Sequence, residues 1–381
     1  MPRIAFSLFL LGAGFAAYIL AGYPLLLAIL AQRGGKPIRK HFTPLTVTVL
    51  LAVYNGEKWI LAKLKSILQQ DYPPDLLQIL VISDGSTDQT DLIVEQFPDS
   101  RVALLRVPHA GKAAALNAGI ARANGDVLFF TDVRQPLHPA ALRHLVACLA
   151  DPHIAGASGQ IVIAAGDGAA ADVGLYWRYE KWLRDKLTAV DSLLVATGCI
   201  YVLRRSLVRP LPPATLVDDA YLPLGAILQG YRFVFERQAI AYDYPTALDT
   251  EFQRKVRTLA GLYQLVGDFP RLLNVFDLTG FQFFSYKLGR VLLPYAFLLI
   301  AVSSFWLPAP WAALVLAVQA FFYGLAAIDH WLPASSPVKR LSSVCRTFTV
   351  LLAAALCAAS ILFVPADRLW KQTQVKAAKS G

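Results

Sequence analysis

The sequence predicts an α/β domain with a mostly parallel, doubly wound sheet, placed between membrane-spanning helices. Three observations lead to this prediction. Apolar, β-branched runs alternate with helical patterns through the middle of the 381-residue chain, as in strands joined by helical crossovers. Long apolar stretches lie before and after this middle part. Finally, the apolar run at residues 77–83 ends in an acidic, glycine-rich turn that contains Asp84, Gly85 and Asp88, and turns at the carboxyl ends of buried parallel strands form ligand-binding crevices.

The composition divides the chain into a middle part typical of a soluble domain and two flanking parts typical of membrane segments. Hydrophobic residues make up 56% of the sequence and charged residues 16%, which is apolar for a soluble protein, and the excess is concentrated in residues 4–31 and beyond residue 281. The net charge of +10 suits either nucleic acid or an anionic membrane surface. A basic segment at residues 32–41 directly follows the first apolar stretch, so we expect membrane lipids and no nucleic acid as partner.

The first apolar stretch, residues 4–30, is long enough to cross a bilayer, which takes about 20 residues. Its apolar core is too long for a cleaved signal peptide, and no small-residue cleavage site follows it. Arg3 is the only basic residue before the stretch, whereas four follow it within residues 32–41. The positive-inside rule therefore places the N-terminus outside and the middle domain in the cytoplasm.

The elements of the middle part follow from periodicity and from turn residues. Apolar runs bounded by turn signals predict strands, at residues 45–54, 78–83, 101–107, 126–131, 154–163 and 231–242. Apolar residues spaced three and four apart predict helices, at residues 57–70, 88–96, 111–123, 139–150, 171–190, 216–228 and 251–264. Prolines 73 and 74 break the first of these helices. The apolar run 193–203 carries small residues and receives no assignment from periodicity.

Two segments have the composition of helices on a membrane surface. Residues 171–190 mix aromatic with basic side chains, which suits either the membrane interface or an amphipathic helix packed on the sheet. Residues 268–276 are short and amphipathic, and suit the interface as well.

Three further apolar stretches, residues 281–304, 310–328 and 344–364, are each near spanning length. Three crossings would leave the C-terminus outside, yet basic residues cluster in the tail. Either the last stretch is re-entrant or interfacial, or the positive-inside rule fails here. The expected domains are an N-terminal transmembrane helix at 1–32, a cytosolic domain at 44–265, an interfacial helix at 266–280, about three transmembrane helices at 281–365 and a basic tail at 366–381.

Acidic residues follow two of the predicted strands. Asp84 ends the second strand and Asp132 follows the fourth, so in a parallel sheet both lie at the carboxyl edge. A single Asp in such a place is most often a helix cap. Two at one edge favour a nucleotide site that binds base, ribose and a divalent cation, because carboxylates and phosphates are the ligands that Mg²⁺ and Mn²⁺ prefer.

Lys112 follows Gly111 at the start of a predicted helix. The glycine permits close approach and the lysine offers a point charge to a phosphate, although the spacing is not that of a P-loop.

Two adjacent acids, Asp218 and Asp219, precede another helix. One can cap the helix and the other can accept a proton as a general base, and their mutual repulsion raises the pKa of one of them. Arg254 and Arg257 lie three apart on one helical face. They form either a solvated basic face or a pair that neutralises a leaving diphosphate.

In this order, the motifs resemble the membrane-embedded family-2 glycosyltransferases of the GT-A fold, which include cellulose, chitin, hyaluronan and poly-N-acetylglucosamine synthases and ceramide glucosyltransferase. The resemblance covers residues 44–265. It rests on the strand 47–53 with Tyr54-Asn55-Gly56-Glu57, and on Ser83-Asp84-Gly85-Ser86-Thr87-Asp88, Gly111-Lys112, Thr131-Asp132, Asp218-Asp219 and Arg254-x-x-Arg257.

The resemblance implies a role for each matching position. It implies that Asp219 is the general base and that Asp132 is the first acid of the D-x-D metal motif. The donor-binding residues that it implies are Ala52, Tyr54, Glu57, Asp84, Lys112, Arg254 and Arg257. The acceptor residues that it implies are Asp218, Thr197, Gly198 and Cys199.

Two departures from the family pattern matter. Arg134 replaces the second acid of D-x-D, so that either one ligand of the expected Mg²⁺ or Mn²⁺ is missing or the arginine itself supplies positive charge. Arg254 and Thr258 replace the Gln and Trp of the family's Q-x-x-R-W motif, and the loss of the Trp argues against processive polymer synthesis.

The implied activity is inverting transfer of a sugar from a nucleotide-diphosphate sugar, expected to be a UDP-sugar, to a saccharide hydroxyl at the membrane, for cell-surface polysaccharide synthesis. The alternative is a glycolipid or polyprenyl-phosphate sugar transferase. A transporter or scaffold with a degenerate domain is disfavoured because Asp84, Asp132, Asp219 and Arg257 are retained. The expected location is the bacterial inner membrane with the catalytic domain in the cytoplasm; an export partner is left open.

Overall fold

The computed structural model describes residues 2–163, 174–244, 248–333 and 335–369. The start of the helix expected at 171–190 and most of the basic tail lie outside these residues. The chain forms two compact units. One comprises Met1–Ile29, Gly166–Tyr179 and Thr246–Gly381, and the other comprises Leu30–Ala165 and Glu180–Pro245.

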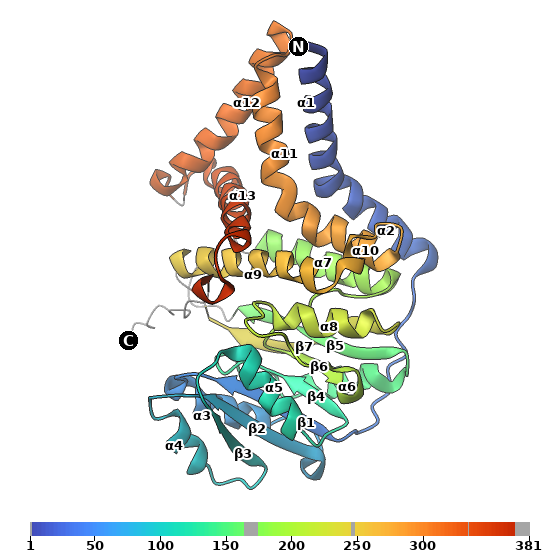
Figure 1. Ribbon diagram of the computed structural model, residues 1–381, viewed down its shortest axis with the longest axis vertical. Coiled ribbons are helices and arrows are strands. Elements are labelled where there is room, and N and C mark those ends of the chain that lie inside the picture. The colour runs from blue at the N-terminus through green and yellow to red at the C-terminus, as the bar shows by residue number, and fades with distance from the viewer. Residues whose placement is uncertain (1, 164–173, 245–247, 334, 370–381) are drawn as a thin grey trace. The chain divides into compact units, whose positions relative to one another are not determined.

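The second unit, which we call the sheet unit, is built on a seven-stranded sheet in the order β3-β2-β1-β4-β6-β5-β7 (Figure 1). The strands are β1 Val47–Val53, β2 Leu77–Asp84, β3 Val102–Val107, β4 Val127–Phe130, β5 Ile154–Ile163, β6 Tyr201–Arg204 and β7 Arg232–Asp243. The helices are α3 Glu57–Leu68, α4 Thr90–Glu95, α5 Lys112–Arg122, α6 Ala141–Ala147, α8 Asp218–Ile227 and the later part of α7 Gly174–Val190.

The sheet is mostly parallel, which confirms the predicted α/β fold class. β1 pairs in parallel with β2 and β4, β2 with β3, and β5 with β7. The exception is β6, which runs antiparallel to both β4 and β5. This strand lies in the apolar run 193–203 that received no assignment, and it occupies only the last part of that run, after the small residues Gly198 and Cys199.

Helices cover both faces of the central strands. On one face, Val49 and Leu51 of β1 pack in a core with Ile60 of α3 and Leu145 of α6, and all four are fully buried. On the other face, α5 packs against β1 and β2. Burying both faces explains why these strands are continuous apolar runs, and it leaves only the strand ends open for chemistry.

The other unit, which we call the helical unit, contains the apolar helices. They are α1 Pro2–Ala17, α2 Tyr23–Gly34, α10 Leu278–Phe283, α11 Gly289–Ser304, α12 Ala309–Ile328 and α13 Lys339–Ala358, together with the amphipathic α9 Leu248–Asp268. Among the described residues, four segments are long and apolar enough to cross a membrane: Arg3–Gly34, Leu278–Ser304, Ala309–Trp331 and Lys339–Leu362.

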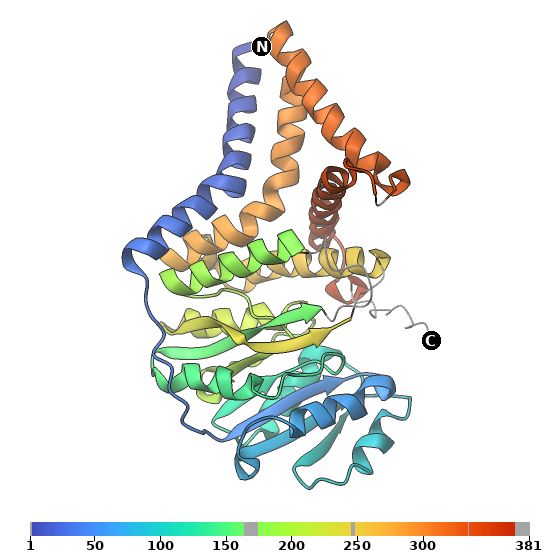
Figure 2. The same cartoon turned by 180° about the vertical axis from the view of Figure 1, so that it is seen from behind.

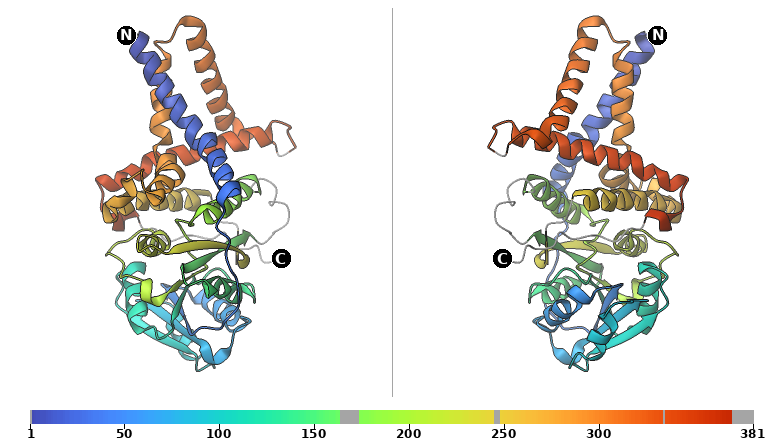
Figure 3. Two further views of the ribbon diagram at one scale, coloured as in Figure 1. Left: turned by 90° about the vertical axis from the view of Figure 1, so that its right-hand side faces the viewer. Right: turned by 90° about the vertical axis from the view of Figure 1, so that its left-hand side faces the viewer.

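Within this unit, α1 runs beside α11 (Figures 1 and 2). By contrast, α13 is seen almost end-on in Figure 1 and runs crosswise in Figure 3, so it makes a large angle with α1 and α11. It therefore does not run alongside them, as a fourth parallel crossing would.

Two π-helical turns face each other in the α1–α11 pair. One, Tyr18–Gly22, joins α1 to α2, and the other, Phe284–Leu288, joins α10 to α11. Tyr18 Oη and Ser285 Oγ lie 2.7 Å apart, and a Cβ on Gly289 would come within 2.3 Å of Ile19 Cδ1. The two turns are thus packed against each other, and both helices bend at this level (Figure 1).

A buried carboxylate ties the end of α12 to the start of α13. Asp329, which is 2% exposed, accepts hydrogen bonds from Ser342 Oγ at 2.7 Å and Ser343 Oγ at 3.0 Å. Lys339 Nζ and Arg346 Nη1 lie 3.1 and 3.2 Å from its oxygens. Every oxygen of the carboxylate is therefore paired, as a buried charge requires.

We expect Asp329→Ala to destabilise the helical unit by about 1–3 kcal/mol, because it leaves the partly exposed Lys339 and Arg346 and two hydroxyls, one of them on the buried Ser342, without their acceptor. Thermal unfolding of the detergent-solubilised protein measures the effect, and Asp75→Asn, at an exposed position, is the control. A melting temperature equal to that of the control would contradict the assignment.

The sheet unit contains a fully buried lysine. Lys63 of α3 is 1% exposed, and its Nζ donates to the carbonyl of Gln135 at 2.5 Å. Burial lowers its pKa from 10.5 to about 8, because the charged form loses its hydration.

This depressed pKa predicts a pH dependence. Between about pH 8 and pH 10.5 the unfolded chain binds more protons at this residue than the folded chain, so the free energy of unfolding rises with pH in that range. Well below pH 8 both states are protonated, and the contribution of Lys63 no longer changes with pH. Lys63→Met should remove this contribution. The difference in melting temperature between wild type and variant, measured from pH 7 to 10, should therefore change with pH. Lys65→Met on the exposed face of α3 is the control, and a constant difference would refute the prediction.

Candidate active site

The carboxyl edge of the sheet gathers the predicted site residues. The parallel strands β1, β2 and β4 end there at Val53, Asp84 and Phe130. Because β6 is antiparallel, it begins at the same edge, where Tyr201 pairs with Phe130. The loops after β1, β2 and β4 and the loop before β6 therefore meet at one place.

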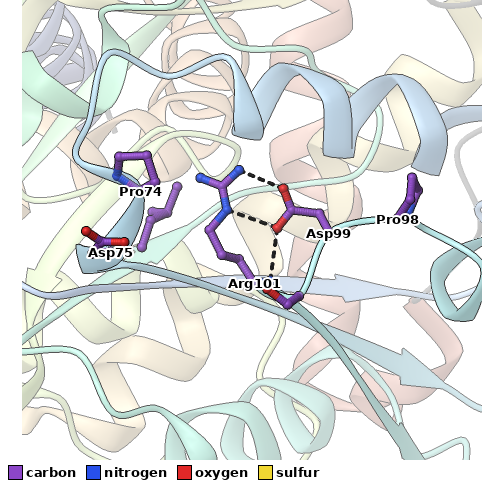
Figure 4. A pocket seen from close by; sticks show the side chains of 7 residues that line it. Pro74, Asp75, Pro98, Asp99 and Arg101 are labelled. Atoms are coloured by element: carbon purple, nitrogen blue, oxygen red, sulfur yellow. Dashed lines mark hydrogen bonds and ion pairs between the residues drawn. The ribbon is translucent and has the colours of Figure 1, made fainter.

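A hollow of about 560 Å³ lies at the opposite edge of the same sheet (Figure 4). It is lined by Leu77 at the start of β2 and by residues that precede β3, including Asp99 and Arg101. The Arg101 guanidinium is already paired with Asp99, at 2.9 and 2.7 Å. Because the charges of Arg101 and Asp99 neutralise each other, neither is left to bind a charged ligand in this hollow. We therefore place the active site at the carboxyl edge of the sheet.

Asp84 organises the first part of the site. It is 4% exposed, and its two carboxylate oxygens accept the backbone N–H groups of Ala110 at 2.9 Å and Gly111 at 3.1 Å. His109 Nδ1 lies 3.0 Å from Asp84 Oδ2, and the His109 ring stacks on Tyr54 with 4.3 Å between centroids. The result is an exposed pair of rings beside an acid, a surface on which a nucleobase can stack and form hydrogen bonds.

His109 was not among the residues predicted from the sequence. It lies two residues before Gly111 in the stretch that carries Lys112, and this neighbourhood was the available signal. Its stacking partner, Tyr54, is more than fifty residues away in the chain, so only the folded structure reveals the pair.

The turns after β1 and β2 are bound to each other. Asn55 Oδ1 accepts the backbone N–H of Thr87 at 2.8 Å, and Glu57 Oε2 accepts that of Gln89 at 3.1 Å. Glu57 therefore stabilises the neighbouring turn. Ala52 is paired in register with Ile82 near the ends of the two strands.

Lys112 is held between two carboxylates. Its Nζ lies 3.1 Å from Asp132 Oδ1 and 3.2 Å from Asp218 Oδ1. Burial lowers the pKa of Lys112, but the negative charges of Asp132, Asp218 and Asp219 outweigh this and hold the pKa above its usual value. Lys112 is also the first residue of α5, so the positive end of the helix dipole adds to its charge.

Asp219 lies against the small-residue loop that precedes β6. A Cβ on Gly198 would come within 3.0 Å of Asp219 Oδ2, so the absent side chain at this position lets the carboxylate approach the loop. The backbone N–H of Ala196 donates to the carbonyl of Asp219 at 2.8 Å. The loop and the first turn of α8 thus fix each other.

Thr197 and Cys199, the other residues of this loop, are held by hydrogen bonds to neighbouring strands and loops of the sheet. Thr197 Oγ1 donates to the carbonyl of Gly159 at 2.7 Å. Cys199 is 2% exposed, and its carbonyl accepts Thr131 Oγ1 at 2.7 Å. The Cys199 thiol therefore packs in the core, and its backbone ties the loop to the end of β4.

Arg134 points to the end of β7. Its Nη2 lies 2.8 Å from Asp243 Oδ2, and Gln135 Nε2 donates to the same oxygen at 3.1 Å. Among the described residues there is no group of three or more His, Cys, Asp and Glu that could hold a metal ion.

Arg254 and Arg257 lie on α9, which belongs to the helical unit. Thr258 Oγ1 donates to the carbonyl of Arg254 at 2.9 Å. The contact of Arg254 and Arg257 with the diphosphate stays a prediction.

Comparison with known proteins finds a matching family and similar chains. The model of the family described as Glycosyl transferase family 2 matches residues 48–211. The chain is 27% identical over 303 residues to the probable glycosyltransferase YdaM of Bacillus subtilis (strain 168), which covers 72% of this chain and 71% of YdaM.

The chain is also 26% identical over 256 residues to WfgD of Escherichia coli, a UDP-Glc:alpha-D-GlcNAc-diphosphoundecaprenol beta-1,3-glucosyltransferase, covering 64% of this chain and 98% of WfgD. Among solved structures, the mannosyltransferase PcManGT from Pyrobaculum calidifontis in complex with GDP-Man and Mn²⁺ has a TM-score of 0.67 at 22% identity, over 95% of this chain and 99% of that one. This likeness shows that the two chains share the GT-A fold.

The turn after β2 provides a test of the site's construction. Gly85 has φ +66°, and a Cβ there would come within 2.8 Å of His109 Cβ. We expect Gly85→Ala to cost about 1–3 kcal/mol of stability through strain and to weaken nucleotide binding by displacing His109.

Gly225→Ala is the matched control, because a Cβ at that helical position meets nothing within 4 Å and should be neutral or stabilising. Thermal unfolding of the two variants checks the prediction. It is wrong if both variants melt at the same temperature.

Proposed function

Because the chain carries a glycosyl transferase family 2 domain and is a glycosyltransferase of nucleotide sugars, we propose that it transfers a sugar from a UDP-sugar to a hydroxyl of a saccharide acceptor with inversion. The transfer takes place at the membrane and serves cell-surface polysaccharide synthesis. The observation that carries the proposal is the convergence of Asp84, Lys112, Asp132 and Asp218 at one sheet edge, with Asp219 against the Gly198 loop.

In this mechanism Asp219 is the base. Its carboxylate accepts the proton of the acceptor hydroxyl while the acceptor oxygen attacks the anomeric carbon of the donor. The bond from that carbon to the diphosphate oxygen breaks, and its electron pair leaves with the nucleoside diphosphate. Attack from the face opposite the leaving group inverts the anomeric configuration.

The donor and the acceptor take different sides of this edge. The uracil is proposed to stack at Tyr54 and His109 and to bind Asp84, while Ala52 and Glu57 shape the turn beside it. The acceptor is proposed to enter over Thr197 and Gly198, beside Asp218, with Cys199 anchoring the loop from below. Arg254 and Arg257 are kept as diphosphate-binding residues on the resemblance of their motif.

A lipid-linked acceptor is the second candidate. The relative WfgD, aligned over 98% of its length, is named for an acceptor on diphosphoundecaprenol, and the part of the chain that the structure describes has four helices apolar enough to cross a membrane. Thr258, at the position of the processive enzymes' Trp, favours single transfer in either case. We place the protein in the bacterial inner membrane with the sheet unit in the cytoplasm.

A donor screen tests the proposal. The purified full-length protein is incubated with UDP-sugars and with GDP-mannose, and the release of nucleoside diphosphate is measured with and without membrane lipid extract. A water-soluble glycan product supports the saccharide acceptor, whereas an organic-extractable product supports the lipid-linked one. Absence of transfer and of donor hydrolysis across the screen would refute the proposed function.

We expect Asp219→Asn to lower kcat by about 100- to 10,000-fold, because an amide cannot accept the proton, while affinity for UDP changes little. Steady-state kinetics and calorimetric titration with UDP measure the two effects. Asp185→Asn, at the ion pair of Asp185 with Arg237 on the exposed side of α7, is the control. Turnover within a few-fold of wild type would remove Asp219 from the role of base.

A further inference from the structure

The loop after β4 differs from the metal-binding loop that the family pattern implies. At the position of the second acid, Arg134 forms an ion pair with Asp243, and their side chains are only 12% and 9% exposed. A guanidinium group has five N–H donors and no lone pair for a cation. The paired and largely buried arginine is therefore a fixed part of the loop, and it cannot become a metal ligand.

The acid that remains, Asp132, already contacts a positive charge. Lys112 Nζ lies within 3.1–3.2 Å of both Asp132 Oδ1 and Asp218 Oδ1. One ammonium ion thus joins the loop after β4 to the first turn of α8. The Lys112 side chain is 24% exposed, so one side of it remains open to a ligand.

These residues do not fit a D-x-D metal site. Mg²⁺ and Mn²⁺ need several oxygen ligands, of which a protein usually supplies one or two carboxylates. In this chain an arginine, Arg134, replaces the second acid of the D-x-D motif, and the first acid, Asp132, is in contact with Lys112. A divalent cation placed at Asp132 would also lie next to the ammonium ion, and the two positive charges would repel each other.

We propose that Lys112 takes the place of the divalent cation, so that the positive charge beside the donor diphosphate is the chain's own ammonium ion and sugar transfer needs no metal. This inference rests on the proposed function. In the reaction, the electron pair of the breaking bond passes to the diphosphate oxygen, and the negative charge that develops there lies beside Lys112, while the acceptor proton goes to Asp219. The start of α5 adds its partial positive charge at the same point.

Nucleotide binding provides the first test and needs no turnover. UDP and GDP are titrated into the full-length protein in detergent by calorimetry, once with excess EDTA and once with MnCl₂. We expect the Kd of the nucleotide that binds to agree within about threefold between the two buffers. A loss of about tenfold or more in EDTA that Mn²⁺ restores, or no binding in either buffer, overturns the inference.

The variant Lys112→Gln tests whether nucleotide affinity depends on this side chain. Lys112→Gln should weaken binding of that nucleotide by about tenfold or more in both buffers, since one charge-assisted contact to the diphosphate is lost. Lys65→Gln on the exposed face of α3 should not change it. Wild-type affinity in a folded Lys112→Gln protein would overturn the inference, and if the variant does not fold, the comparison of buffers on the wild-type protein decides.

Turnover separates this inference from the proposed function. Transfer at equal rates in EDTA and MnCl₂ supports both. Transfer that requires Mn²⁺ overturns the inference and leaves the proposed function standing. Absence of transfer in both buffers refutes the proposed function, and the binding experiment still decides the role of Lys112.

Discussion

The ammonium ion of Lys112 between the carboxylates of Asp132 and Asp218 is the interaction on which the active edge depends. Two acids in a partly desolvated site repel each other unless a cation lies between them. A single lysine at the start of α5 satisfies both. It thereby couples the start of α5, the loop after β4 and the first turn of α8, which are far apart in the sequence, and the reversed β6 completes the arrangement because its amino end lies beside the end of β4.

Much of this site could be predicted from the sequence. Asp84 and Asp132 follow apolar runs that alternate with helices, and that alternation determines that both acids lie at the same edge of a parallel sheet. Lys112 was predicted because a glycine precedes it at the start of a helix. These predictions concern residues whose position follows from the strand or helix beside them.

The remainder depends on contacts between distant segments. The sequence left two possibilities for Arg134, and the structure shows that it pairs with Asp243, more than a hundred residues away, a partner that no local pattern identifies. His109 acquires its place by stacking on Tyr54. The strand β6 occupies only the last part of an apolar run that has no clear periodicity, so the sequence alone did not explain why the loop with Gly198 reaches Asp219.

The paired π-helical turns, Tyr18–Gly22 and Phe284–Leu288, have a consequence for how this chain can change in evolution. A π turn holds one more residue than a turn of the α-helix on either side of it, and here the two turns are joined through Tyr18 and Ser285. Loss of one residue from a single turn would return that turn to the α-helical repeat, so that its bend is lost and Tyr18 and Ser285 no longer meet. Insertions and deletions in these two segments should therefore be inherited together, as a matched pair.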